Sequence, residues 1–140
     1  MSQFKHNLTV NWGDCDDAGI VFYPTFFYWF DSTYHAFLRS SNVKLRDLRE
    51  RYQAVTPLMD AGSNFRSPVT YDDVITIEAV VAEWALKRFR LEYTVTCGDR
   101  LIASGYELRS WATVDEQGRL KGSPIPDEFK AALGGPVTQG

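Results

Sequence analysis

The segment PTFFYWFDSTYHAFLRS, at residues 24–40, constrains the fold more than any other part of this chain. Its bulky side chains recur at helical spacing and its polar side chains fall on another face, which predicts an α-helix. Pro24 suits the first helical position, where its missing N–H costs nothing. A helix this rich in aromatic residues is stable only when other parts of the molecule cover most of it. The bulky set is Phe26, Trp29, Phe30, Tyr34, Phe37 and Leu38.

Long strands with alternating side chains are available to cover that helix. In residues 87–97, apolar side chains share one side and polar side chains share the other, as a half-buried strand requires. Gly98-Asp99 then predicts a tight hairpin. We therefore expect an α+β fold in which one long helix is wrapped by a curved antiparallel sheet. The other expected strands are 4–12, 74–84 and 101–114, and the other expected helices are 44–51 and 125–133.

The length and the charge of the chain narrow its organisation and its partners. The 140 residues contain no repeat or internal linker, so we expect one domain over residues 1–133 and a flexible tail over residues 134–140. The net charge of −3 disfavours nucleic-acid binding. No apolar run reaches the roughly 18 residues of a membrane span, and the first residues lack the apolar core of a signal peptide. Cys15 and Cys97 form no metal-ligand spacing, and we expect a reduced, cytoplasmic setting, with a disulfide between them as the open alternative.

The stretch GDCDDAG, at residues 13–19, places three aspartates within four positions. A calcium loop of the EF-hand type is disfavoured, because Ala18 stands where the motif needs Asp or Asn and Thr25 stands where it needs Glu. An aspartyl-phosphate motif fails at the same alanine. A solvated turn stays open as an interpretation, since Asp and Gly are both favoured in turns.

The position of this turn opens a catalytic alternative. Residues 20–23 and Pro24 follow directly, so a carboxylate in the turn is expected to lie beside the N-terminus of the long helix. Free N–H groups at a helix N-terminus carry partial positive charge and form an oxyanion site. A carboxylate beside such a site can attack a thioester carbonyl, or deprotonate a water molecule that does. The turn therefore fits acyl transfer.

Two motifs carry a resemblance to a known family. One is GDCDDAGIVFYP at residues 13–24 with WFD at 29–31, and the other is YDDVITIE at 71–78 with EW at 83–84. Together they resemble the 4-hydroxybenzoyl-CoA thioesterases of the hotdog-fold superfamily, from about residue 8 to about residue 127. The order of the expected helices and strands agrees with that fold.

The resemblance implies a role for three residues. Asp16 would be the catalytic carboxylate, the backbone N–H of Tyr23 would polarise the thioester carbonyl, and Asp31 would contact a hydroxyl group on the aryl ring. The resemblance also implies that neither a metal nor a redox cofactor is needed. It further implies active sites between subunits, in a homotetramer built as a dimer of dimers.

Some positions indicate a particular branch of that family, and others differ from the family's pattern. Pro24 follows Tyr23 where related short-chain acyl-CoA thioesterases often have His, which favours the aryl-CoA branch. Asp17 stands where the family has proline, so a second carboxylate adjoins Asp16. The basic residues that follow Trp84 are also fewer than in the family.

A small group of basic residues is the candidate site for the CoA phosphates. Lys87, Arg88 and Arg90 lie near the start of a predicted strand in an otherwise acidic protein. They are candidates to bind the 3′-phosphate and the pyrophosphate of CoA. Charged side chains on the wet face of a strand are common, so this simpler interpretation also stays open.

Other residues have competing explanations. Asp31 precedes His35 by four residues on one helix face, so an ordinary ion pair is the alternative to ligand contact. Cys15 is a poor nucleophile, because the neighbouring carboxylates suppress its thiolate. Five aromatic residues could line an acyl pocket or belong to the core: Trp12, Phe22, Phe26, Phe27 and Trp29.

We therefore expect hydrolysis of an aromatic acyl-CoA to the free acid and CoA, with Asp16 as nucleophile or general base. Three alternatives stay open. The first is a thioesterase with a broad or aliphatic preference, and the second is a non-catalytic acyl-CoA-binding protein of the same fold. The third is a hotdog dehydratase, for which His35 in mid-helix is a poor proton-abstracting group.

Overall fold

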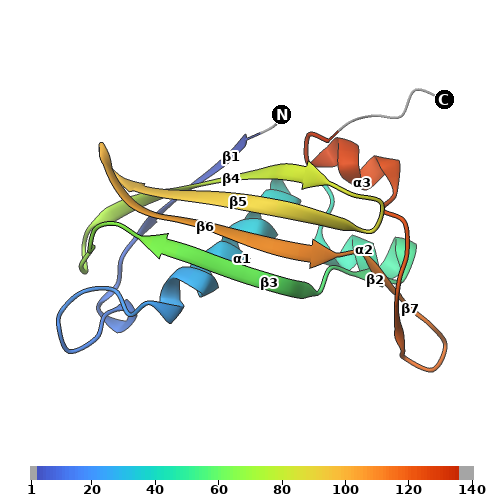
Figure 1. Ribbon diagram of the computed structural model, residues 1–140, viewed down its shortest axis with the longest axis horizontal. Helices are drawn as coiled ribbons and strands as arrows, with labels where there is room; N and C mark the ends of the chain where they lie inside the picture. Colours follow the sequence, from blue (N-terminus) through green and yellow to red (C-terminus); the bar gives the residue numbers. More distant parts are fainter. Residues whose placement is uncertain (1–2, 136–140) are drawn as a thin grey trace.

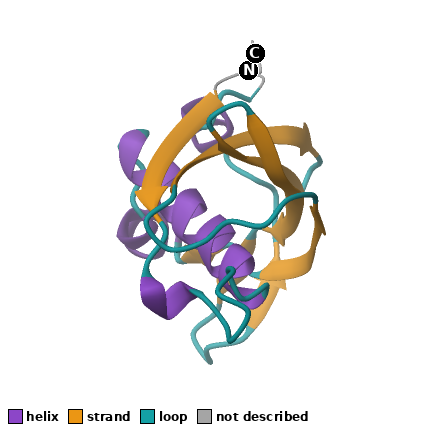
Figure 2. Ribbon diagram, turned by 90° about the vertical axis from the view of Figure 1, so that its left-hand side faces the viewer, coloured by secondary structure: helices purple, strands orange, loops and turns teal. Residues whose placement is uncertain are grey.

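The computed structural model describes residues 3–135, in which a curved antiparallel sheet encloses one long helix (Figure 1). The sheet has five strands in the order β1-β4-β5-β6-β3. Figure 2 shows α1, Pro24–Ser40, lying in the hollow of that sheet. The predicted α+β arrangement is thereby confirmed. The strands are β1 (Gln3–Thr9), β3 (Leu58–Phe65), β4 (Val74–Trp84), β5 (Arg88–Cys97) and β6 (Arg100–Ser110).

The core lies between α1 and the inner face of the sheet. All six bulky residues that predict the helix are buried, and the alternating apolar side chains of β5 from Phe89 to Val95 are buried opposite them. Phe30 stacks on Tyr93 of β5, with the ring centroids 4.7 Å apart. Gly105 of β6 permits this approach, because a β-carbon there would overlap the Phe30 ring. The helix therefore packs directly against the backbone of the sheet.

A second, smaller sheet and two short helices gather at one end of the molecule. They lie at the end where β4 turns into β5, on the right of Figure 1. Arg51 of α2 and Glu128 of α3 join the two helices through an ion pair of 2.8 Å. The elements are β2 (Ala54–Val55), β7 (Ala112–Val114), β8 (Leu120–Gly122), α2 (Leu45–Tyr52) and α3 (Asp127–Ala132).

Three parts of the chain differ from the expectations. The first strand ends at Thr9, and the short 3₁₀ helix η1, Trp12–Asp14, follows it. The strand expected over 101–114 breaks at Trp111, whose N–H bonds to the carbonyl of Lys87, so that its end joins the second sheet. The edge strand β3 was not predicted, because its sequence LMDAGSNF is poor in the β-branched residues that mark strands.

The ends of the described chain bear on two further expectations. The first two residues of the expected tail, Gly134 and Gly135, donate hydrogen bonds to the carbonyls of Ala131 and Lys130 in α3. The remainder of that tail, residues 136–140, lies outside the described residues. Among residues 3–135, no helix combines the length and the apolar character needed to cross a membrane.

Candidate active site

The acidic turn forms the tip of a narrow hairpin, residues 14–22, which we call the acidic hairpin. The N–H of Phe22 bonds to the carbonyl of Asp14 and the N–H of Asp16 bonds to the carbonyl of Ile20, both at 2.9 Å. Gly19 closes the turn with a positive φ of 77°. Since Tyr23 follows at once, the hairpin fixes the tip of the turn relative to the start of α1.

Asp16 lies at this tip with an exposed side chain. One carboxylate oxygen, Oδ1, accepts a hydrogen bond of 2.8 Å from the N–H of Ala18. The carboxylate also lines an open hollow of about 570 Å³ together with Cys15, Phe22 and the rest of the turn. The Asx-type bond orients the side chain and leaves Oδ2 without a partner among residues 3–135, which suits a nucleophile or a base.

The neighbouring aspartate Asp14 has a structural role. Its Oδ2 accepts a hydrogen bond of 2.8 Å from the N–H of Asn11 and so caps η1. The carboxylates of the turn are therefore not equivalent, and Asp16 is the one oriented by the tip itself.

Tyr23 supplies the free donor that an oxyanion site requires. It is the residue before Pro24, the first residue of α1, and proline has no N–H. The next N–H groups, of Thr25 and Phe26, bond to the carbonyls of Phe22 and Tyr23. In the described part of the chain, the N–H of Tyr23 has no acceptor, so it can donate to a substrate oxygen.

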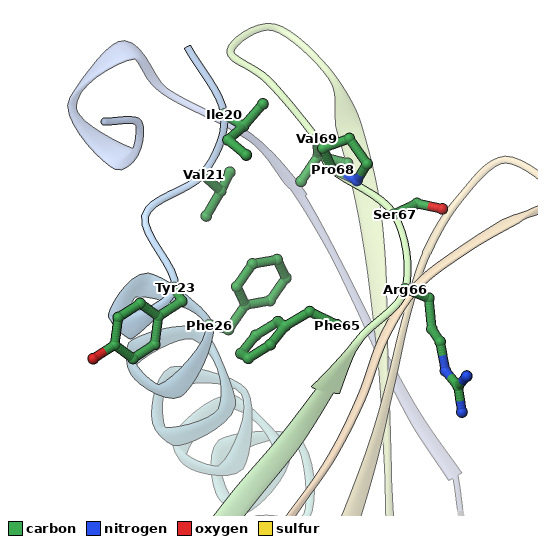
Figure 3. Close-up of a pocket in the computed structure, with 9 residues that line it drawn as sticks. All are labelled: Ile20, Val21, Tyr23, Phe26, Phe65, Arg66, Ser67, Pro68 and Val69. Carbon is green, nitrogen blue, oxygen red and sulfur yellow. The ribbon is translucent and has the colours of Figure 1, made fainter. Parts of the chain in front are cut away.

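An apolar cavity of about 420 Å³ opens beside the start of α1 (Figure 3). The rings of Phe26 and Phe65 meet edge to face, with centroids 5.1 Å apart, and Phe65 also meets Tyr23 at 6.4 Å. Figure 3 shows the side chain of Arg66 directed away from these rings. The full lining is Ile20, Val21, Tyr23, Phe26, Phe65, Arg66, Ser67, Pro68 and Val69. Such a cavity has the chemistry of an aryl-binding pocket.

The five aromatic residues considered for an acyl pocket divide between several places. Phe26 lines the cavity, and Trp29 is buried in the core. Trp12 is 74% exposed and meets Tyr71 on the surface, while Phe22 lines the hollow beside Asp16. Phe27 packs against the core. The cavity residue that the sequence did not reveal, Phe65, ends the unpredicted strand β3.

Asp31 lies further along α1, and its carboxylate is hydrogen-bonded to a residue of the sheet. Its Oδ1 accepts a hydrogen bond of 2.8 Å from Nη2 of Arg109 on β6, and its Oδ2 lies 3.7 Å from Nδ1 of His35. The His35 contact is the ion-pair geometry considered as the alternative to ligand binding. The stronger partner is Arg109, which is 78 positions away and was not predicted.

Beneath Asp31 lies a buried polar network, in which we call Asp31, Glu107 and Arg109 the Arg109 cluster. Arg109 is 5% exposed and Glu107 is 3% exposed, and Nε of Arg109 donates to Oε1 of Glu107 at 3.1 Å. Tyr93 donates to the same carboxylate oxygen at 2.6 Å, and Nη1 of Arg109 donates to the carbonyl of Thr56 at 3.0 Å. The buried charges are thus hydrogen-bonded as well as paired.

This network also fixes protonation states. Burial, followed by the charge of Glu107, raises the pKa of the Tyr93 phenol well above its ordinary value. Burial is the largest single influence on the pKa of Arg109 and lowers it, but the charge of Glu107, the hydrogen bond to Asp31 and the neighbouring phenols together outweigh burial, so the pKa lies above its ordinary value. Tyr93 is therefore a neutral donor and Arg109 a permanent cation.

The three basic residues proposed for the CoA phosphates lie at the β4–β5 turn. Arg88 and Arg90 flank a hollow of about 190 Å³ beside Trp84, which Lys87 does not line. Arg90 is already engaged, since its guanidinium lies 3.5 Å from Glu92 and 4.1 Å from the ring centroid of Tyr106. In Figure 1 this turn lies at the opposite end of the sheet from the acidic hairpin.

Within one protomer, the predicted site residues therefore fall into two separate groups. Asp16 and Tyr23 lie at one end. Asp31 lies toward the other end with Arg88 and Arg90, because its partner Arg109 is paired with Phe89 across the sheet. Within residues 3–135, no group of three or more His, Cys, Asp or Glu side chains is arranged to hold a metal ion.

The model of the Thioesterase-like superfamily matches residues 10–133. A 4-hydroxybenzoyl-CoA thioesterase from Pseudomonas sp. strain CBS-3 is 32% identical over 127 residues, covering 86% of this chain and 89% of that protein. The crystal structure of the enzyme from that strain superposes with a TM-score of 0.84 at 28% identity, covering 93% of this chain and 98% of that one.

Two other solved structures share the fold. A gentisyl-coenzyme A thioesterase superposes with a TM-score of 0.79 at 32% identity, covering 93% of this chain and 98% of that chain. A 1,4-dihydroxy-2-naphthoyl-CoA thioesterase from Synechocystis superposes with a TM-score of 0.84 at 21% identity, covering 94% of this chain and 96% of that chain. These neighbours confirm the predicted hotdog fold.

Proposed function

The chain belongs to the Thioesterase-like superfamily, and from that premise we propose that it hydrolyses an aromatic acyl-CoA to the free acid and CoA. Its assignment as an acyl-CoA thioesterase of the hotdog family rests on the family match and on relatives named as thioesterases. The aromatic preference rests chiefly on one observation: the cavity beside the Tyr23 N–H is lined by Phe26 and Phe65. Benzoyl-CoA and hydroxy- or aminobenzoyl-CoA are the proposed substrates.

The proposed chemistry uses Asp16 and the start of α1. The thioester oxygen accepts a hydrogen bond from the N–H of Tyr23, and the positive end of the helix dipole stabilises the oxyanion that forms. As a nucleophile, the Asp16 carboxylate attacks the carbonyl carbon, and the C–S bond breaks to release CoA thiolate and leave a mixed anhydride. Water then hydrolyses the anhydride, which yields the acid and regenerates Asp16.

A general-base route uses the same geometry. Asp16 removes a proton from water, the resulting hydroxide attacks the thioester carbon, and the tetrahedral intermediate collapses with loss of the CoA thiolate. In both routes the Tyr23 N–H stabilises the same oxyanion. Solvent oxygen found in Asp16 after a single turnover in heavy-oxygen water would identify the nucleophilic route, because the general-base route never forms a bond to that carboxylate.

The position of Asp31 supports a site shared by two subunits. Asp31 follows Tyr23 by eight residues, which is about 12 Å along a helix axis. That distance is longer than a benzoyl group, so a ring bound beside Tyr23 does not reach Asp31 of the same chain. We therefore propose that Asp31 contacts a substrate bound by a second copy of the chain.

The edge strand β3 suits the pairing of two copies. It exposes Leu58, Met59 and Phe65, whereas the other edge, β1, carries Lys5 and His6. Unpaired apolar edges readily add a strand from another chain, and a charged edge discourages it. We propose that β3 pairs antiparallel with its copy across a two-fold axis.

This pairing brings the two separated groups together. β3 runs from Leu58, opposite Arg109, to Phe65, which lines the cavity beside Tyr23. Antiparallel pairing places the first end of one copy beside the second end of the other. Asp31, Arg88 and Arg90 of the partner subunit would then approach the cavity. Two such dimers would form the predicted homotetramer through the outer face of the sheet, which light scattering tests.

The experiment that tests the substrate follows thiol release from a panel of acyl-CoAs. The panel contains benzoyl-, hydroxybenzoyl-, aminobenzoyl-, acetyl- and hexanoyl-CoA. We expect the aromatic thioesters to have the highest kcat/KM. Faster hydrolysis of hexanoyl-CoA would identify the aliphatic alternative, and binding without thiol release would identify an acyl-CoA-binding protein.

A further inference from the structure

We propose that Arg109 is a positioning residue that fixes the Asp31 carboxylate, so that its second oxygen meets a hydrogen-bond donor on the acyl ring. The inference rests on the proposed function, because it concerns the selectivity of that same site. The contact between Asp31 and a ring hydroxyl is the one that the family resemblance implies, and the new element is the role of Arg109 in fixing the carboxylate that makes it.

The guanidinium of Arg109 is held from several directions. Nε donates to Glu107 on the same strand, Nη1 donates to the carbonyl of Thr56, and Nη2 donates to Asp31 on α1. Its plane lies over the ring of Tyr34, with the guanidinium carbon 4.3 Å from the centroid. A side chain that is 5% exposed and bonded on every nitrogen presents its last donor in one direction only.

Asp31 is the member of the Arg109 cluster that reaches the surface. Its side chain is 48% exposed, whereas those of Arg109 and Glu107 are 6% and 3% exposed. Arg109 occupies Oδ1, whereas Oδ2 has only His35, at 3.7 Å. One oxygen of the carboxylate is thus fixed by a buried donor, and the other is left for a hydrogen-bond donor on a ligand.

The charges of the Arg109 cluster favour a ligand that donates a hydrogen bond to Asp31. Glu107 and Arg109 neutralise each other, and Tyr93 donates a further bond to Glu107. The negative charge of Asp31 is then the excess in the cluster, and Oδ2 is the oxygen that Arg109 does not engage. A ring hydroxyl or amino group would satisfy that oxygen, while an unsubstituted ring would cover it without a partner. Sites built on a buried polar group discriminate strongly against ligands that leave it unpaired.

The test compares hydroxybenzoyl-CoA with benzoyl-CoA. Arg109→Lys keeps the charge but removes the planar fork that sets the direction of the bond. We expect the ratio of kcat/KM for hydroxybenzoyl-CoA over benzoyl-CoA to fall by about tenfold, mainly through KM. The kcat for benzoyl-CoA should stay within about threefold of wild type. Asp31→Asn should lower the ratio similarly, and combining it with Arg109→Lys should add little.

A second variant separates position from charge. Asp31→Glu keeps the carboxylate but moves it by one methylene, at a half-exposed site where folding is expected to survive. If Arg109 sets the position, this variant also loses selectivity. The control is Arg51→Lys, which makes the same replacement in an arginine–carboxylate pair at the surface, between α2 and α3. It should leave the ratio unchanged.

The outcomes distinguish this inference from the proposed function. Equal loss of activity on both thioesters in Arg109→Lys, or retained selectivity in Asp31→Glu, would assign Arg109 a purely structural role and overturn the inference. The proposed function would survive either result, provided that the wild type hydrolyses aryl-CoAs and Asp16→Asn does not. Absence of aryl-CoA hydrolysis in the wild type would overturn both.

Discussion

The two ends of the molecule carry different kinds of candidate machinery. At the first end, beside the N-terminus of α1, Asp16 and Tyr23 come from one continuous stretch and depend on backbone hydrogen bonds within the acidic hairpin. Toward the second end, Asp31 in the middle of α1 depends on Arg109, a side chain from a distant strand that is buried beneath it. The first end can lose a candidate functional side chain without disturbing packing. The second end cannot, because the candidate site and the folded core share the same buried charges.

The largest expected effect tests the first end. Asp16→Asn removes the nucleophile or base while keeping the shape, so kcat should fall by about 10²- to 10⁴-fold. The side chain is exposed, and the free energy of unfolding should change by less than about 0.5 kcal/mol. Steady-state kinetics measure the change in kcat, and urea unfolding measures the change in the free energy of unfolding. Near wild-type kcat would contradict the role of Asp16.

The second effect tests whether the other end carries stability. Arg109→Met leaves Glu107 buried without its cation, and such changes cost about 3–5 kcal/mol. Urea unfolding of the variant measures the loss. Arg51→Met is the matched control, since its pair with Glu128 lies at the surface and should contribute far less. Equal losses in the two variants would remove the contrast between the buried and the surface pair.

A third effect tests whether two copies must join the two ends. Leu58→Lys adds charge to the exposed edge β3, and we expect the dimer dissociation constant to rise about tenfold or more. Activity per chain should then fall on dilution. Leu120→Lys on β8 is the control, because Leu120 is 57% exposed and Leu58 is 51% exposed. Undiminished activity in a monomeric Leu58→Lys would contradict the shared site.

The smallest effect concerns pH. The pKa of Tyr93 is raised above its ordinary value of 10.0 in the folded chain, so the phenol ionises more readily when unfolded. Its contribution to stability is complete below pH 10 and is lost as the pH rises further, by about 1.4 kcal/mol per pH unit. Tyr93→Phe should therefore lose less stability than wild type between pH 9 and pH 11. Tyr28→Phe, at a residue that is 70% exposed, should behave as wild type.

The features that the sequence could predict are those that depend on residues close together in the chain. The helix over 24–40 and the strand over 87–97 follow from short-range periodicity, and the structure has them as α1 and β5. The acidic hairpin and the start of α1 were also recognisable, because both motifs are local. The catalytic role of Asp16 and the cytoplasmic location stay predictions.

The parts of the fold and of the candidate site that the sequence did not predict depend on contacts between distant residues. β3 lacks a strand-like composition and exists because β6 pairs with it. Arg109 lies between Leu108 and Ser110 on β6, two positions after the charged Glu107, and this local sequence does not indicate that it faces inward toward Asp31. A periodic pattern reports which residues share a face, but not which partner across the core satisfies a charge.

Gly105 has a consequence for the whole inner face. Its single hydrogen lets Phe30 rest on the sheet, and this contact sets the depth at which α1 lies in its groove. Asp31 is the residue after Phe30, so a methyl group at position 105 would lift the helix and lengthen the reach between Asp31 and Arg109. Under the proposed role of Asp31, a substitution on the floor of the groove, remote from any ligand, would therefore change the choice of substrate.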